Sequence, residues 1–390
     1  MKCTLSELTI DGKGTYGIAA SAVDYDSRKQ TYLRITDIND DGTINFGGLK
    51  SVDAEDSNKY ILKENDIVFA RTGASIGRSY FYQKEDGVFV YAGFLIKYSL
   101  DPQKVNPRFL KYYTHSKLYY DWVHSFDSGA TRGNINAKTF GDMLIELPDR
   151  KCQDKIVSIL KALDDKIAVN RRICENLEAQ AQALFKHWFI DFAPFKDGKF
   201  VESELGMIPE GWRVGTLFDI ADVYDSRRKP LSGMQRANME KIYPYYGATD
   251  QMDMVDSYIF DGRYVLMGED GSVVRENGLP YIQYVWGKIW VNNHAHVLSG
   301  KDGFTTEMLI PFLTKYNIKG LITGAVQAKL NQASMANIKI AIPPINILNE
   351  CNGLFDSIYA KYRQCKLESS RLSTLRDTLL PKLMSGQIKL

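Results

Sequence analysis

The residues best suited to metal-dependent chemistry are Pro148-Asp149 followed by Asp164-Asp165-Lys166, which match the PD…DxK arrangement of nucleases. Such a site needs its carboxylates and lysine on adjoining strands, where a divalent metal can lie beside the scissile phosphate. Asp164 and Lys166 instead fall within a predicted helix, two residues apart, and therefore face different directions. In a second copy of this region, Pro343-Pro344 and Tyr359-Ala360-Lys361 stand at these positions without the acids. The match is interpreted as a coincidence.

A second candidate for metal chemistry is His294-Ala295-His296, which puts two imidazoles on one face of a predicted strand. The sequence suggests no acidic or cysteine third ligand nearby, and the counterpart segment Ala92-Gly93-Phe94 contains no histidine. Packing or hydrogen bonding is the favoured role of the two histidines, with a DNA contact as the second choice. No metal site is predicted.

The segment ARTGASIGR, residues 70–78, combines glycines that let a backbone approach a ligand closely with arginines that can fork onto phosphate or guanine. The parallel segment GEDGSVVR, residues 268–275, replaces Arg71 by neutral or acidic residues, so the two copies should not make the same contacts. For any single side chain, a strand-connecting turn with solvated arginines is the slightly favoured alternative.

A repeated loop supplies the other polar candidates. The tetrapeptides TRGN at 131–134 and VQAK at 326–329 differ in side chains of the types that pair with base edges. The basic run Arg227-Arg228-Lys229 could contact phosphates, which position a protein without specifying sequence. The candidate DNA contacts are Arg71, Thr72, Ser75, Arg78, Thr131, Arg132, Asn134, Arg227, Arg228, Lys229, Ser272, Gln327 and Lys329.

These candidates must be positioned by a chain that contains one unit twice. Residues 128–148 (SGATRGNINAKTFGDMLIELP) and 323–343 (TGAVQAKLNQASMANIKIAIP) align without a gap. Such repetition indicates a pseudo-two-fold protein, and these proteins commonly recognise a two-part target. The identical pairs, each 195 positions apart and expected to set the frame of the loop, are Gly129 with Gly324, Ala130 with Ala325, Asn136 with Asn331 and Pro148 with Pro343.

Each copy is predicted to form a mixed lobe. Short β-branched and aromatic runs bounded by turn residues predict strands at 67–70, 88–91 and 143–147, and an aromatic-faced helix is predicted from Asn106 to Trp122. The expected fold class is α/β (mixed α+β). Two similar globular lobes are separated by two long antiparallel coiled-coil helices in a pseudo-two-fold repeat.

The two long helices are predicted from apolar positions spaced alternately by four and three, the pattern of a heptad seam. Neither helix could bury its stripe alone, so the two should pack antiparallel. Asn170 is a candidate register device, with a solvated gap as the alternative, and Pro381 should end or kink the second helix. The seam residues are Ile156, Leu160, Leu163, Ile167, Asn170, Leu177, Leu184, Phe355, Ile358, Tyr362, Leu372 and Leu379.

The composition is that of an ordinary globular protein, with 390 residues, 44% hydrophobic and 25% charged. A domain that binds nucleic acid through a uniformly basic surface would carry more than the net charge of +2, so positive charge must be local if DNA is the ligand. No apolar run reaches the length of a membrane span and residues 1–5 open no signal peptide, so a cytoplasmic location is expected. Five scattered cysteines without a CxxC pair fit a reducing compartment.

Four segments occur in a diagnostic order within the duplicated frame: GATRGNINAKTF at 129–140 followed by LP, ALFKHWFIDF at 183–192, ELGMIPEGW at 204–212 and LRDTLLPKLMSGQI at 375–388. With them, the chain resembles the specificity (S) subunit of type I restriction–modification systems over nearly its whole length. The resemblance implies two target-recognition domains, each reading one half of a bipartite double-stranded DNA site. It also implies two helices that set the spacer between the halves and dock two methyltransferase (M) subunits, to which endonuclease (R) subunits can add.

The resemblance further implies that this chain is not an enzyme. In agreement, the sequence contains no FxGxG-type methyl-donor loop, no Asn-Pro-Pro-aromatic tetrapeptide and no Walker loop. No cofactor is expected on the chain, while S-adenosylmethionine, ATP and Mg²⁺ are expected on partner subunits. The predicted domains are 1–150 (first target-recognition domain), 151–190 (first spacer helix), 191–212 (connector), 213–344 (second target-recognition domain) and 345–390 (second spacer helix).

Two alternatives stay open from the sequence. A stand-alone metal-dependent nuclease would cut plasmid DNA with Mg²⁺ and no partner. A two-lobed protein-binding adaptor would lack salt-sensitive, sequence-preferring affinity for duplex DNA.

Overall fold

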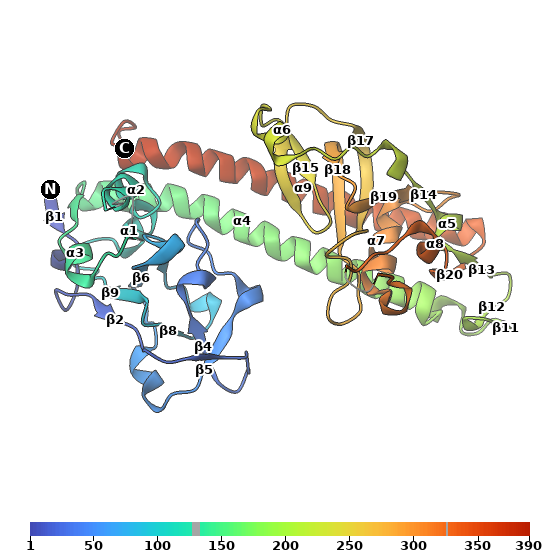
Figure 1. Ribbon diagram of the computed structural model, residues 1–390, viewed down its shortest axis with the longest axis horizontal. Coiled ribbons are helices and arrows are strands. Elements are labelled where there is room, and N and C mark those ends of the chain that lie inside the picture. Colours follow the sequence, from blue (N-terminus) through green and yellow to red (C-terminus); the bar gives the residue numbers. More distant parts are fainter. Residues whose placement is uncertain (127–132, 325–326) are drawn as a thin grey trace. The chain divides into compact units, whose positions relative to one another are not determined.

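The computed structural model describes residues 1–126, 133–324 and 327–390. They form two compact units, the first made of Met1–Ala168 with Ser369–Leu390 and the second of Val169–Glu368. Figure 1 shows the elements of each unit with the labels used below. Each unit contains a mixed lobe and one part of each long helix, so the predicted fold class of two like lobes with two long helices is confirmed.

The first unit is built from short strands and helices around two four-stranded sheets, ordered β2-β9-β6-β7 and β3-β5-β4-β8, and the pair β1-β10. Its elements are β1 (Lys2–Thr4), β2 (Thr15–Tyr16), β3 (Ala22–Val23), β4 (Gln30–Leu33), β5 (Lys50–Val52), β6 (Asp66–Ala70), β7 (Ser79–Phe81), β8 (Phe89–Tyr91), β9 (Leu95–Ser99), α1 (Pro107–Tyr113), α2 (Lys117–His124), α3 (Ala137–Gly141), β10 (Leu144–Glu146) and the start of α4 (Arg150–Phe185).

The second unit has one six-stranded sheet, ordered β14-β19-β17-β18-β15-β16, and the pairs β11-β12 and β13-β20. Its elements are β11 (Phe200–Ser203), β12 (Gly206–Pro209), β13 (Arg213–Thr216), α5 (Leu217–Ile220), β14 (Ala221–Val223), α6 (Gly233–Ala237), β15 (Tyr243–Tyr246), β16 (Gln251–Val255), β17 (Phe260–Gly268), β18 (Ile282–Val291), β19 (Ala295–Gly300), α7 (Thr306–Lys315), α8 (Gln332–Met335), β20 (Lys339–Ile342) and the start of α9 (Ile345–Met384).

The two lobes share a strand plan. In the first, β6 lies between β9 and β7, and in the second β17 lies between β19 and β18, with antiparallel pairing throughout. The long strand β18 also pairs in parallel with β15, as the separate strand β8 pairs in parallel with β4. The single strand β18 of the second lobe therefore corresponds to both β7 and β8 of the first lobe.

The repeated asparagines form the same cap in both lobes. The side chain of Asn136 accepts a hydrogen bond from the backbone N–H of Thr139 at 2.9 Å, and that of Asn331 accepts one from Ser334 at 2.8 Å. Each asparagine thus caps the N-terminus of a short helix, α3 or α8. The expectation that these residues set the frame is confirmed for the two asparagines.

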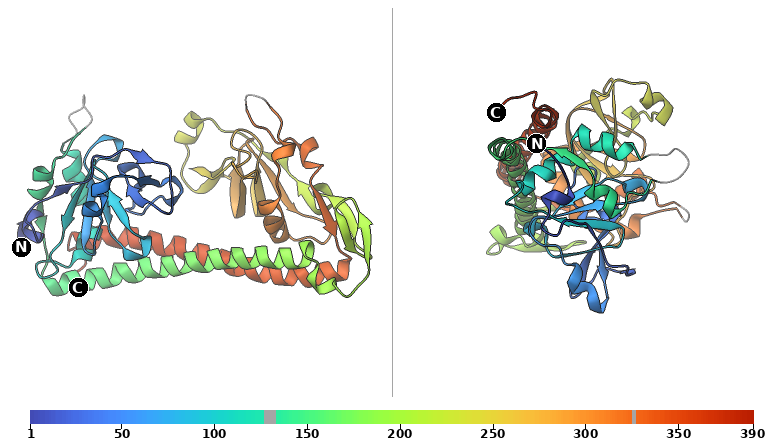
Figure 2. Two further views of the ribbon diagram at one scale, coloured as in Figure 1. Left: turned by 90° about the horizontal axis from the view of Figure 1, so that it is seen from below. Right: turned by 90° about the vertical axis from the view of Figure 1, so that its left-hand side faces the viewer.

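The long helices run antiparallel within each unit. In the first unit, Ile156 and Leu160 near the start of α4 share a core with Leu383 near the end of α9. In the second unit, Cys174 and Ala181 from the end of α4 share a core with residues from the start of α9, among them Phe355, Tyr359 and Cys365. The left-hand view of Figure 2 shows α4 and α9 side by side in each unit.

Every predicted seam residue is buried or half-buried. Asn170 is buried, and its amide nitrogen donates to Oε2 of Glu368 at 2.8 Å, so it is no solvated gap. Pro381 lies in the last turn of α9, which ends at Met384, as expected for a proline that ends the helix in its last turns. No helix among the described residues is long and apolar enough to cross a membrane.

Two local predictions were incomplete. The helix expected from Asn106 to Trp122 is two helices, because Ser116 accepts a hydrogen bond from the backbone N–H of Tyr119 and starts α2 anew. The connector at 191–212 contains the hairpin β11–β12, and its Trp212 packs against Phe189, Phe192 and Phe195. The connector is therefore an ordered part of the second unit.

Candidate nucleic-acid interface

The candidate loops of the first lobe meet at the end of β6. The backbone N–H of Arg71 donates to the carbonyl oxygen of Phe94 at 3.1 Å, and the N–H of Ile135 donates to the carbonyl of Arg71 at 2.9 Å. Thr72 forms an antiparallel bridge with Asn134. We call Arg71, Thr72, Phe94 and Asn134, with Tyr16 beside them, the first corner. Among the residues that the structure describes, main-chain hydrogen bonds connect the loop after β6 to the loop that carries Asn134.

The guanidinium of Arg71 lies between two exposed rings. Its Cζ is 5.0 Å from the ring centroid of Tyr16 and 5.9 Å from that of Phe94, distances typical of cation–π contacts. The rings are 41% and 56% exposed. The Nε of Arg71 is buried without a hydrogen-bond partner, and Arg71 makes no ion pair within the ranges that the structure describes. Within those ranges the guanidinium is therefore a cation that contacts two rings and has no acidic partner.

The second lobe contains the same corner with different side chains. The N–H of Glu269 donates to the carbonyl of His294 at 2.8 Å, the N–H of Leu330 donates to that of Glu269 at 3.0 Å, and Asp270 bridges Lys329. Glu269 thus stands where Arg71 stands in the first lobe, in line with the predicted acidic or neutral replacement. We call Glu269, Asp270, His294 and Lys329 the second corner.

The sequence pairing of the histidine segment was wrong by two residues. His294 occupies the position of Phe94, because both carbonyls accept the hydrogen bond from the residue after the central strand. His296 consequently corresponds to Ile96 and not to Phe94. The predicted strand also begins one residue later than expected, at Ala295.

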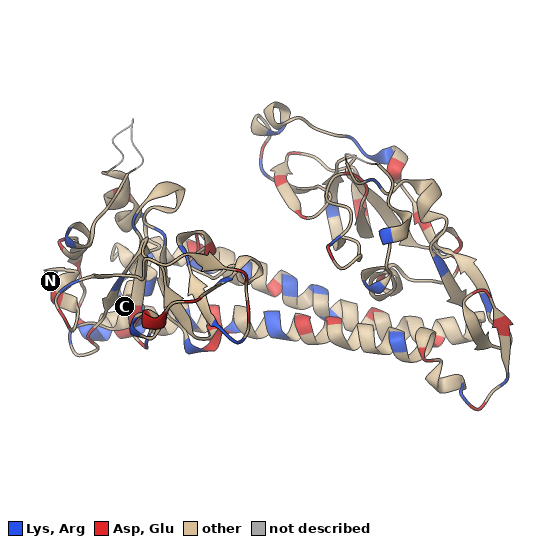
Figure 3. Cartoon of the chain, turned by 60° about the horizontal axis from the view of Figure 1, so that its bottom comes forward, with Lys and Arg blue, Asp and Glu red and all other residues tan. Residues whose placement is uncertain are grey.

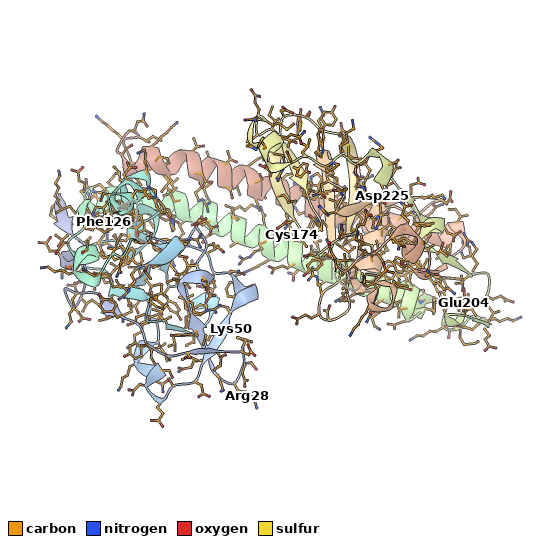
Figure 4. The ribbon with its side chains drawn as sticks, viewed as in Figure 1. Arg28, Lys50, Phe126, Cys174, Glu204 and Asp225 are labelled. Atoms are coloured by element: carbon orange, nitrogen blue, oxygen red, sulfur yellow. The ribbon has the colours of Figure 1, made fainter. Side chains whose placement is uncertain are left out.

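A buried ionic cluster lies directly beneath the second corner. His296, with its side chain 1% exposed, has Nδ1 at 2.6 Å from Oδ2 of Asp225 and Nε2 at 2.6 Å from the carbonyl oxygen of Leu330. Arg228 pairs with Glu269, and its Nη1 also donates to the carbonyl of Ala295 at 2.7 Å. Figure 4 labels Asp225 within this unit. This cluster was not predicted from the sequence, because its acids lie far from His296 along the chain.

The cluster keeps Asp225 ionised. Burial by itself would raise the pKa of Asp225, but hydrogen bonding to His296 and Gln332 and the charges of His296 and Arg228 together lower it. Ligand atoms of Asp225, Glu269 and His296 lie within 4.8 Å of one another, a geometry open to a metal ion. Arg228 already neutralises this group from within, so the arrangement joins segments of the lobe to one another.

Three of the predicted DNA contacts are buried or hydrogen-bonded within their own lobe. Ser75 is buried. Arg78 donates to Asp40 at 2.6 Å and to the carbonyl of Ile38 at 3.1 Å, so it fixes a turn of its own lobe. Arg228 is 10% exposed and held in the cluster. Both arginines make hydrogen bonds within the lobe. The sequence alone does not distinguish such an arginine from a solvated one.

The other candidates are more accessible. Thr72 and Arg71 are half-buried in the first corner, and Arg227 packs over the ring of Phe260 at 4.7 Å. Thr131 and Arg132 lie outside the described residues. The candidates that are exposed are Asn134, Arg227, Lys229, Ser272, Gln327 and Lys329.

The residues of the nuclease-like match serve packing. Asp164 on α4 pairs with Lys111 of α1 at 3.0 Å and with Arg376 of α9 at 3.1 Å, and it accepts a hydrogen bond from the hydroxyl of Tyr112 at 2.9 Å. Its neighbour Asp165 pairs with Lys161 one turn away on the same helix. Asp164 thus joins the first lobe to both helices.

Comparison with known proteins identifies the family. The model described as "Type I restriction modification DNA specificity domain" matches residues 8–179 and 209–353, one match for each repeat and most of the chain together. The chain belongs to this specificity family. Its function is the recognition of DNA sequence for a type I restriction–modification system, and neither the nuclease nor the adaptor alternative gains support.

Proteins that are similar to this chain agree with the family assignment. A Haemophilus influenzae protein described as a type I restriction enzyme specificity subunit is 36% identical over 144 residues, which make up 37% of this chain and 36% of that protein. The HindI specificity subunit of the same organism is 24% identical over 410 residues, covering 85% of this chain and 88% of that subunit. The S subunit of a type I system from M. genitalium shares the fold, with a TM-score of 0.54, 18% identity and coverage of 98% and 95%.

Proposed function

We propose that each lobe contacts one half of a bipartite DNA target through its corner, and that the two halves differ in sequence. The observation that carries this proposal is that the same main-chain hydrogen bonds hold a cationic side chain in the first lobe and an acidic side chain in the second. Arg71 stands at a position of the first corner that Glu269 occupies in the second. A guanidinium without an acidic partner among the described residues favours phosphate oxygens and guanine, whereas an acid paired with Arg228 does not.

Arg71→Ala should weaken recognition of the first half-site. Loss of one well-placed base contact costs about 1–3 kcal/mol of binding free energy, and the fold should tolerate the change because Arg71 makes no ion pair among the described residues. The measurement is selection of duplexes from a randomised DNA library by the complex assembled with its methyltransferase subunit. Arg71→Lys keeps the charge but not the fork, so it separates a base contact from a phosphate contact. An unchanged motif and affinity in both variants would contradict a role for Arg71.

We further propose that the helix pair fixes the spacer and that the duplicated units dock two methyltransferase subunits at pseudo-equivalent places. A surface that occurs twice offers the same contact twice. Basic and acidic residues are interspersed along both helices, as the blue and red segments of Figure 3 show, and this composition suits a polar protein–protein surface. Mass measurement of the active complex should give two methyltransferase subunits for each copy of this chain. A one-to-one complex with full activity would contradict the proposal.

The chain itself is proposed to catalyse nothing. Its acids with the spacing of a nuclease are engaged by Lys111, Arg376 and Lys161, and the buried cluster beneath the second corner is closed by Arg228. S-adenosylmethionine, ATP and Mg²⁺ are therefore expected on the methyltransferase and endonuclease subunits, the latter joining through the assembled complex.

A further inference from the structure

Gln332, at the start of α8 beside the second corner, is exposed yet has a fixed amide orientation. Its Nε2 donates to Oδ2 of Asp225 at 2.7 Å. A carboxylate only accepts hydrogen bonds, so the amide nitrogen and not the carbonyl oxygen must face Asp225. A primary amide has two N–H groups and one carbonyl. The bond to Asp225 therefore leaves one N–H and the carbonyl oxygen of Gln332 for a ligand.

The carboxylate that orients Gln332 is itself immobilised. The backbone N–H of Val297 donates to Oδ1 of Asp225 at 3.1 Å, and His296 contacts Oδ2 at 2.6 Å. The other nitrogen of His296 reaches the carbonyl oxygen of Leu330, two residues before Gln332. Asp225 and the loop that carries Gln332 are thus held by one buried imidazole.

The first lobe has a hydrogen bond at the corresponding place, but the donor there is a backbone N–H and not a side-chain amide. Tyr16 pairs in register with Ile96, the position that His296 takes in the second lobe. The register of β14 with β19 continues with the hydrogen bond from Tyr224 to Val297, so the next residue, Asp225, comes opposite His296 and corresponds to Tyr16. The hydroxyl of Tyr16 accepts a hydrogen bond at 3.0 Å from the backbone N–H of Ala137, which is 195 positions before Gln332. In the first lobe this contact only joins two segments, whereas in the second lobe it ends in an exposed amide.

We propose that Gln332 reads an adenine in the half-site bound by the second lobe, and that Asp225 and His296 are its positioning residues. The inference rests on the proposed function. One N–H and one carbonyl on a planar amide match N7 and the N6 amino group of adenine in the major groove, and glutamine makes this bidentate pair. The hydrogen bond to Asp225 orients the amide of Gln332 before DNA binds, and this orientation favours adenine. The reversed amide is disfavoured because its carbonyl oxygen would face the carboxylate of Asp225, and neither group can donate a hydrogen bond.

The test uses the full chain in the complex with its methyltransferase subunit and a randomised duplex DNA library. The wild-type complex should select an adenine at one position of one half-site. Gln332→Ala should reduce the preference for adenine there by on the order of tenfold to a hundredfold, and leave the other half-site unchanged. Gln332→Met keeps the length of the side chain without its donor or acceptor, and should behave alike. Both variants should remain folded and lose a similar amount of thermal stability, because each removes the hydrogen bond that Gln332 donates to Asp225.

Two comparisons sharpen the result. Gln327→Ala removes another exposed glutamine of the same loop, and any effect of it should fall at a different base. Asp225→Asn should lower the adenine preference although it does not touch DNA, because it releases the amide of Gln332. Retained adenine preference in both Gln332 variants would overturn the inference, as would an equal loss of affinity for all sequences, which indicates a phosphate contact. If the wild-type complex selected no bipartite sequence, the proposed function itself would be rejected.

Discussion

Exchange of residues 1–150 for the matching lobe of another family member should change one half of the DNA target and leave the other half and the spacer unchanged. The physical reason is that each lobe has its own core. Leu5, Phe69 and Phe140 belong to a cluster confined to the first unit, and Leu217, Val265 and Leu330 to one in the second. Methylation mapping of DNA from cells that carry the wild-type or the exchanged chain measures the outcome.

The junction at residue 150 imposes one condition on the exchange. Asp164 and Arg376 stay with the recipient, while Lys111 and Tyr112 come with the donor lobe. A donor without a cation at the position of Lys111 would leave Asp164 with fewer partners, and a chimera that restores this lysine is the appropriate control. A simultaneous change of both half-sites in a well-folded chimera would mean that the lobes do not read independently.

Asp164→Asn should cause the largest loss of stability among single substitutions at the nuclease-like match. Its carboxylate is 19% exposed and faces Lys111 and Arg376, which are 18% and 25% exposed. Removal of one partner from such a buried group costs about 3 kcal/mol of unfolding free energy. Lys111 then has no acidic partner among the described residues, and Arg376 keeps only the exposed Asp377. Hydrogen exchange of the first unit measures this loss, with the amides of the second unit as an internal reference.

The neighbouring acid is the matched control. Asp165 is 59% exposed and pairs with Lys161 along one helix, so Asp165→Asn should cost only about 0.3–0.5 kcal/mol. Equal effects of the two substitutions would show that Asp164 does not join the lobe to the helices.

The loss at Asp164 should depend on pH. Burial alone would raise its pKa, but the charge of Lys111 and hydrogen bonds from Lys111, Arg376 and Tyr112 outweigh burial and lower it. Because the pKa is lower in the folded state, the stabilisation is fully present above the unfolded-state pKa of about 3.9 and disappears as pH falls through the folded-state value. The difference between wild type and Asp164→Asn should therefore be constant near neutral pH and shrink in strong acid.

The parts of the fold that the sequence predicted are those that depend on local pattern. The heptad spacing located both helices, and the repeated Asn136 and Asn331 marked a cap because an asparagine at that position bonds to a backbone N–H three residues ahead. The break at Ser116 was missed because the aromatic periodicity continues across it.

The candidate site was less predictable because it depends on contacts between distant segments. His296 meets Asp225 and Glu269 only after three segments of the second lobe come together, and Arg228 is internal for the same reason. An arginine in a basic run has the same sequence signature whether it is solvated or paired. The position of Gln332 carried no signal, because its partner Asp225 is over one hundred residues away.

The main-chain bridges in the two corners also affect how the sequence of such a protein can change during evolution. Thr72 bridges Asn134 and Asp270 bridges Lys329 through main-chain atoms, which every residue except proline can supply in full. Side chains at these positions can change without removing a hydrogen bond that the fold requires. If the corners read the target as proposed, a lineage can acquire a new target sequence by few mutations at little risk to folding. Every partner subunit proposed to assemble on the chain would then act at the new target.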